Sequence, residues 1–411
     1  MGGWKRNLYV IAGAEFLTVL GFSCMLSFIP YYIQELGISD LDEVALWAGL
    51  VSSAPSLLMA FVSPIWGFMA DRYGRKVMLE RAIFGASLCL GLCGLVRNVQ
   101  QFVAIRVVQG ALTGSVSAAT TLVASVTPRE RSGYGLGILQ MAIYAGASFG
   151  PLVGGVIADN LGYRPVFGFT SVLLLLSGLC VVLFVSEDFE PARDRPERVG
   201  GRIWGDVKAT LRSTQLLGVL AVSVVARLAD SSVRPMLPIF VQLLAPTEER
   251  IASVAGSVSA ASAVVAGLAS IVAGRWGDKL GYRKILLSCT IGACLLLIPQ
   301  AFVREVWQLF VLRALVGACV GGTFPLVSAA VAVSVAPERQ GAAHGVNNSA
   351  RALGRALGPM LGAATATTLG FRAVFLVAAV LFGITAVTIA TLIGDRAGEG
   401  TPVERTTGAK V

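Results

Sequence analysis

Charged residues are scarce in this 411-residue chain, at 14%, whereas roughly a quarter of the residues in soluble domains are charged. Hydrophobic residues make up 55% of the sequence, and the mean hydropathy is +0.74. Twelve helical spans of about 20 residues would use roughly 240 residues, which leaves no room for a sizeable soluble domain. The composition therefore excludes soluble, fibrous and disordered classes and predicts a polytopic membrane protein.

Residues that build metal or nucleotide sites are also in short supply. The sequence has one histidine, His344, which we interpret as a plain helix-end residue, and its seven cysteines all fall inside apolar runs. Neither a metal site nor disulfides are predicted. A phosphate-binding loop with Gly, Lys and Ser or Thr is missing, as are paired carboxylates at a membrane face. We therefore expect no cofactor, no metal and no enzymatic activity.

Twelve apolar runs are long enough to cross a bilayer. They begin near Leu8, Leu46, Met78, Phe102, Tyr134, Val166, Leu216, Ile251, Ile285, Trp307, Ala342 and Ala373. The first run continues to about Ile33 without a cleavage pattern, so we expect a first span and not a signal peptide. The predicted organisation is a six-helix bundle over 1–186, a cytoplasmic linker over 187–214 with a short interfacial helix, a second bundle over 215–394, and a cytoplasmic tail over 395–411.

The basic residues are distributed unequally between the two sides of these spans. If the N-terminus is cytoplasmic, the inner segments hold 21 Lys and Arg residues and the outer loops hold 5. The positive-inside rule then places both termini in the cytoplasm of a multi-pass inner-membrane protein. Because orientation explains the net charge of +9, no nucleic-acid partner is expected. We expect a monomer surrounded by lipid.

The sequence contains an internal repeat. Arg106, Gly110 and Gly114 recur as Arg313, Gly317 and Gly321 at an offset of 207, and Gly150-Pro151 recurs as Gly358-Pro359 at 208. Two six-span halves related in this way are typical of transporters whose binding site lies between the halves at the bilayer midplane.

A glycine-rich basic turn follows the second span and is repeated in the second half. Gly67 permits close helix approach, Gly74 permits a tight turn, and an acid between them can cap a facing helix. We interpret the segment as a conformational latch made by Gly67, Asp71, Arg72, Gly74, Arg75 and Lys76, with Asp278 in the second copy. A basic loop that only sets topology is the alternative.

This turn resembles the signature of the major facilitator superfamily, and the resemblance covers the whole chain. Arg106, Gln109 and Gly110 are similar to its fourth-span motif. The fifth-span motif associated with antiporting exporters is matched by Gly146, Gly150, Pro151, Gly154 and Gly155. The nearest resemblance is to the twelve-span drug:proton antiporter group. It implies an all-α fold of two six-helix bundles that exports small amphipathic compounds in exchange for protons by alternating access.

The chain departs from that group at four positions. Ser27 stands where the first span usually has a proline, and Arg227, Asp230 and Arg234 are charged where uncharged residues are usual. Ionisable residues inside a membrane are costly and are therefore functional or paired. Glu15 and Asp230 are the acids within the spans, so both are candidates for proton coupling. Alternatively, Glu15 stays charged in a hydrated mouth and Asp230 belongs to a structural ion network.

The substrate cavity is predicted from polar stripes at helical spacing, such as the one along the fourth span. The candidates are Phe22, Arg106, Gln109, Thr113, Ser117, Gln140, Tyr144, Arg227, Arg234, Asn348, Arg351 and Arg355. If Arg313 is included, the candidates comprise six arginines and two acids. A cavity that exports only cations would be expected to hold more acids than arginines. An exporter of an anionic or zwitterionic metabolite is therefore an alternative function. A proton-coupled uptake symporter is a second alternative, which the fifth-span motif disfavours.

Overall fold

The computed structural model describes residues 3–128, 131–187, 214–335 and 340–393. The helix predicted within the linker and the predicted tail lie outside these ranges. The long elements within them are all α-helices. They are α1 (Gly3–Leu26), α2 (Ile29–Glu35), α3 (Leu41–Tyr73), α4 (Arg75–Cys93), α5 (Val99–Leu112), α6 (Ser115–Val126), α7 (Ser132–Leu161), α8 (Tyr163–Phe184), α10 (Thr214–Val233), α11 (Leu237–Leu244), α12 (Ile251–Leu280), α13 (Tyr282–Gln300), α14 (Val306–Val333), α15 (Gln340–Leu369) and α16 (Phe371–Leu392).

Ten segments of the described chain are long and apolar enough to cross a membrane. The two remaining predicted spans correspond to α4 and α15. Helix α4 is less apolar because Arg75, Lys76, Glu80 and Arg81 lie in its first two turns. Helix α15 is rich in polar residues along its first half. Both helices pack within their own bundles, α4 against α8 and α15 against α10. Their polar residues are therefore compatible with a place in the bundle.

Three of the predicted spans are interrupted. The first span divides into α1 and α2 around Ser27, and the seventh divides into α10 and α11 around Arg234. Arg234 is the residue equivalent to Ser27 in the repeat. The fourth divides into α5 and α6 at Gly114, whose φ of +127° is accessible mainly to glycine. The expectation of continuous first and fourth spans is therefore wrong. Interrupted helices are a common way to expose polar backbone at a transporter's binding site.

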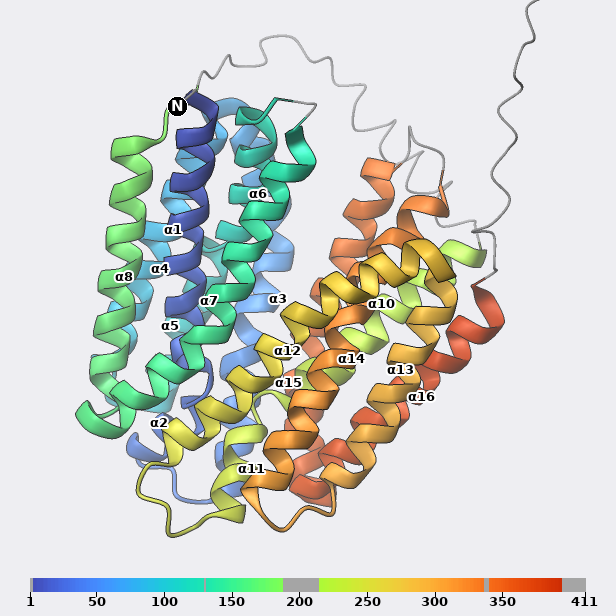
Figure 1. Cartoon of the computed structure of the whole chain (residues 1–411). Helices are drawn as coiled ribbons and strands as arrows, with labels where there is room; N and C mark the ends of the chain where they lie inside the picture. Colours follow the sequence, from blue (N-terminus) through green and yellow to red (C-terminus); the bar gives the residue numbers. More distant parts are fainter. Residues whose placement is uncertain (1–2, 129–130, 188–213, 336–339, 394–411) are drawn as a thin grey trace, which may run out of the picture.

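The helices form two bundles, α1–α8 and α10–α16 (Figure 1). The bundles touch along two long helix pairs, α7 with α12 and α3 with α15, and also where α2 meets α11. They converge at the end that holds α2 and α11 and splay apart toward the end where α1 begins (Figure 1). We call the first of these the closed end and the second the open end.

Two glycines bring the bundles into contact at equivalent places. Gly256 of α12 lies against the carbonyl group of Pro151 in α7. Gly49 of α3 lies against the carbonyl group of Pro359 in α15, where an added methyl group would be 2.9 Å from the oxygen. Because the offset of the repeat relates the two contacts, the interface has an approximate twofold axis.

Polar side chains join the bundles at the closed end. The Tyr31 hydroxyl donates to the Pro238 carbonyl oxygen at 2.6 Å. The amides of Gln34 and Gln242 exchange two hydrogen bonds of 2.9 and 3.1 Å. Gln34 and Gln242 are 208 residues apart, which is the offset of the repeat, so each glutamine pairs with its own counterpart near the axis.

Candidate functional site

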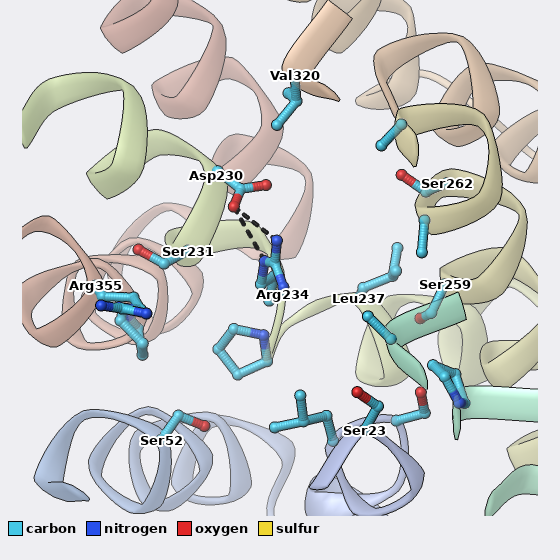
Figure 2. Close-up of a pocket in the computed structure, with 18 of the residues that line it drawn as sticks. Ser23, Ser52, Asp230, Ser231, Arg234, Leu237, Ser259, Ser262, Val320 and Arg355 are labelled. Carbon is cyan, nitrogen blue, oxygen red and sulfur yellow. Dashed lines mark hydrogen bonds and ion pairs between the residues drawn. The ribbon is translucent and has the colours of Figure 1, made fainter. Parts of the chain in front are cut away.

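A cavity of about 460 Å³ lies between the two bundles. Serines from both halves line it, including Ser23 and Ser52 on one side and Ser259 and Ser262 on the other (Figure 2). Five arginines and one acid also line it, namely Arg106, Arg227, Arg234, Arg313, Arg355 and Asp230. The cavity is therefore polar, shared by both halves and rich in positive charge.

Asp230 is held by arginines one helical turn before and after it. Its Oδ2 lies 3.2 Å from Arg227 Nη1 and 2.9 Å from Arg234 Nη2, as expected for i−3 and i+4 neighbours. The side chains of Asp230 and Arg227 are 7% and 15% exposed, whereas that of Arg234 is 58% exposed. The Arg227 guanidinium also lies 3.6 Å from the ring centroid of Phe324. The geometry is that of an ion network in the cavity wall.

Asp230→Asn is expected to destabilise the protein by about 3 kcal/mol, because it leaves the buried Arg227 guanidinium without a counter-charge. We expect a lower midpoint in a thermal-unfolding series of the purified protein in detergent. Arg234→Gln is the matched control and should have a small effect, because it removes the exposed partner and keeps the buried pair. Equal midpoints for wild type and Asp230→Asn would contradict this role.

The other cavity arginines differ in their contacts. Arg106 Nε donates to the Val51 carbonyl oxygen at 3.3 Å, and its Nη1 donates to the Gln109 side chain. Arg313 is only 8% exposed, and its buried Nε has no hydrogen-bond partner among the described residues. Arg355 projects from α15 beside the Asp230 network (Figure 2). Arg313 and Arg355 thus supply positive charge to the cavity without an ion pair in the described part of the chain.

Glu15 lies in a different environment, because it is buried in the N-terminal bundle and is not among the residues that line the cavity. It is 1% exposed, and its Oε1 accepts a hydrogen bond of 3.0 Å from Ser115 Oγ. Its Oε2 is buried and has no partner in the described ranges. Ser115 is the first residue of α6, so the break at Gly114 places this hydroxyl against α1. No cation neutralises Glu15 among the described residues.

Several predicted cavity residues lie elsewhere in the described structure. Of the twelve, Arg106, Tyr144, Arg227, Arg234 and Arg355 line the cavity. The others do not: Phe22 packs against the core, Gln109 is buried beside Arg106, Thr113 caps α5, Arg351 lies 5.2 Å from the Phe324 ring centroid, and Ser117, Gln140 and Asn348 are exposed. These seven remain predictions, for instance as contacts in another state of the transporter.

Sequence reasoning missed the serines of the cavity wall. Ser52 and Ser56 on α3 are spaced i, i+4, and Ser259 and Ser262 on α12 are spaced i, i+3. Each pair therefore lies on one helix face. Small polar residues at this spacing in an otherwise apolar span were the sequence signal that could have predicted these cavity-lining serines.

The predicted antiporter motif divides its contacts between the two bundles. Gly146, Gly150 and Gly154 of α7 pack against α1, and a methyl group on Gly146 would lie 2.7 Å from the Phe16 carbonyl oxygen. Pro151 and Gly155 instead face α12, where a methyl group on Gly155 would lie 2.6 Å from the Ala252 carbonyl oxygen. The motif therefore joins α7 to its own bundle on one face and to the opposite bundle on the other.

The predicted latch lies at the open end. Gly74 ends α3 with φ of +98° and begins the turn into α4. The Glu187 carboxylate accepts hydrogen bonds from the backbone amides of Arg75 and Lys76 at 3.2 and 2.7 Å. Gly67 and Arg72 lie in the last turns of α3. The side chains of Asp71 and Asp278 lie outside the described part of the structure, so the latch stays a prediction.

Two repeat-related helical bundles around a shared polar cavity define a secondary transporter of small molecules. The sequence profile of the Major Facilitator Superfamily matches residues 11–252 and 219–410. The chain belongs to the Major Facilitator Superfamily and is a multi-pass membrane transporter, not an enzyme.

Its similarity to individual proteins extends over nearly its full length. It is 39% identical over 377 residues to the multidrug resistance protein MdtG of Dickeya zeae, covering 92% of this chain and 91% of that protein. It is 38% identical to MdtG of Escherichia fergusonii, covering 93% of each.

Solved structures share the fold at low sequence identity. A bacterial homologue of the lysosomal transporter Spinster, in an inward-facing and occupied conformation, has a TM-score of 0.76 at 16% identity, over 93% of this chain and 95% of that chain. The human organic anion transporter MFSD10 has a TM-score of 0.69 at 19% identity, over 95% and 100% of the two chains.

Proposed function

We propose that this protein is a drug:proton antiporter of the inner membrane, which exports small amphipathic compounds by alternating access. The observation that carries the proposal is the contact of α7 with α12. Pro151 and Gly155 of the fifth-span antiporter motif pack against α12, so this motif helps to hold the two bundles together at the closed end. The near-full-length relatives named multidrug resistance protein support the same function.

The proposed orientation places both termini in the cytoplasm, as the distribution of basic residues predicts. In this orientation the open end faces the cytoplasm, and the structure corresponds to an inward-open state ready to take substrate from the cytoplasm or the inner leaflet. Opening of the closed end would release substrate outside. The Gly67–Lys76 turn is the proposed latch that closes the cytoplasmic end in that state.

Glu15 is the proposed proton carrier. An uncompensated carboxylate inside a membrane protein costs several kcal/mol, and the only described polar contact of Glu15 is with a neutral hydroxyl. The protonated form is therefore favoured in this state, and release of the proton requires a change in the surroundings of α1 and α6. Asp230, with two arginine partners, is better suited to hold the wall of the cavity.

The excess of positive charge in the cavity supports the proposal that the amphipathic substrates are anionic, zwitterionic or neutral with hydrogen-bonding groups. Five arginines and one acid line the cavity, so an anionic group would supply counter-charge that the described residues do not. The serines provide further hydrogen-bond donors and acceptors. A proton-coupled uptake symporter would share this cavity but has no need of the exporter motif.

A resistance panel tests the proposed function. Cells that lack their own exporters should gain resistance to at least one amphipathic compound when they express this protein, and an uncoupler that collapses the proton gradient should remove the gain. The panel should include anionic, neutral and cationic compounds, with the empty vector as control. Increased cellular accumulation of the compounds would instead support uptake.

A further inference from the structure

The N-terminus of α12 receives its cap from the opposite bundle. The Asp159 carboxylate, at the end of α7, accepts hydrogen bonds from the backbone amides of Ala252 and Ser253 at 3.1 and 2.7 Å. The residue in the N-cap position of α12 is Arg250, whose side chain makes no capping hydrogen bond. The first amides of a helix need acceptors and carry partial positive charge, so a carboxylate there is favourable.

Three other helices begin with a cap from their own chain segment, whereas the first amides of α4 donate to Glu187 of the same bundle. Asp40 Oδ1 accepts from the amides of Asp42 and Glu43 at 2.8 and 3.0 Å at the start of α3, the counterpart of α12 in the repeat. Asn98 caps α5, and Glu305 caps α14. The cap on α12 is thus a departure from the approximate twofold symmetry, and it crosses the interface.

Close approach of the backbones makes this contact possible. Gly155 lies one helical turn before Asp159, and an added methyl group there would lie 2.6 Å from the Ala252 carbonyl oxygen. The position equivalent to Asp159 on α15 is Thr367, whose hydroxyl donates to carbonyl groups of its own helix. The second interface, between α15 and α3, therefore has no equivalent cap in the described structure.

We propose that Asp159 is a positioning residue of the transport cycle, which stabilises the state that is closed at the α2–α11 end. When this end opens, α7 and α12 separate, the carboxylate leaves the two amides, and α12 loses the cap that no residue of its own replaces. The inference rests on alternating access between the bundles and is independent of which compounds are exported or in which direction.

Asp159→Ala is expected to raise the population open at the α2–α11 end about tenfold, which corresponds to the loss of one charged helix cap. Spin labels report this population when they are attached to cysteines that replace Arg97 and Phe302 in an otherwise cysteine-free protein. Both residues are exposed and lie in loops of opposite bundles at the closed end. Their distance distribution is measured by pulsed electron resonance in lipid nanodiscs, without substrate.

Two further variants separate gating from folding. Asp40→Ala removes a cap of the same kind from within one bundle and should leave the distance distribution unchanged. Arg250→Asp places a cap within the segment of α12, so the double variant Asp159→Ala/Arg250→Asp should recover protein abundance while the population stays shifted. A double variant with the wild-type distribution, or equal shifts for Asp159→Ala and Asp40→Ala, would overturn the proposal. Neither result would bear on drug efflux, which the resistance panel tests separately.

Discussion

Glu15→Gln is expected to abolish concentrative efflux while substrate binding and downhill exchange persist. The side chain keeps its shape and its contact with Ser115 but can no longer gain or lose a proton. One proton moving through 100 mV supplies about 2.3 kcal/mol, which supports a concentration ratio of about 50-fold. We therefore expect that ratio to fall to about 1 in the variant, as measured with a labelled substrate in proteoliposomes under an imposed proton gradient.

Matched variants distinguish proton coupling from packing at Glu15. Ser115→Ala removes the hydroxyl that contacts Glu15 Oε1 but leaves the carboxyl group, so coupled transport should continue. Concentrative efflux that persists in Glu15→Gln and disappears in Asp230→Asn at normal abundance would move the coupling role to Asp230. Full concentrative efflux in the double variant would exclude both acids.

Arg313→Gln and Arg355→Gln are expected to weaken the binding of an anionic amphiphile about tenfold or more, because each removes a charge-assisted hydrogen-bond donor worth about 1.5–3 kcal/mol. Both side chains line the cavity and have no ion pair with a described acid. A cationic amphiphile of similar size should bind as well as before or more tightly. Dissociation constants for the two compounds, measured by tryptophan fluorescence on purified protein, provide the comparison.

Arg351→Gln tests whether the effect is confined to the arginines that line the cavity in the described state. Arg351 lies one helical turn before Arg355 on α15, but it is not among the residues that line the cavity. Its replacement should change neither dissociation constant by more than about twofold. If Arg313→Gln and Arg355→Gln weaken both compounds equally and lower protein abundance, these arginines are structural and the charge argument fails.

The large-scale architecture followed from the sequence because it depends on local properties. Apolar length alone places a segment in a bilayer, and the repeat at 207–208 residues relates the two halves. Interruptions of the helices were harder to predict. The run from Leu8 to Ile33 is largely apolar, and Pro30 at the start of α2 is the local signal for its division at Ser27. Gly114 was visible as a glycine, but its positive φ was not.

The break at Gly114 also explains why the predicted stripe of the fourth span is only partly realised. A stripe at i, i+3, i+7 and i+11 requires one continuous helix, and α5 ends at Leu112 before α6 begins at Ser115. Arg106 on α5 lines the cavity, whereas Ser117 on α6 does not. The same break brings Ser115 to Glu15, a contact between residues 100 positions apart.

Sequence by itself determined the class of the protein, its two repeat-related halves and the helical spacing that brings Arg227 and Arg234 to Asp230, because these depend on composition, offset or spacing along one helix. Tertiary structure alone decided which of the predicted polar residues line the cavity, that Ser115 reaches Glu15, and that Asp159 caps a helix of the opposite bundle. Each of these contacts depends on how two helices that are far apart in the chain pack against one another. The spacing of residues along either helix does not indicate which helix it will contact.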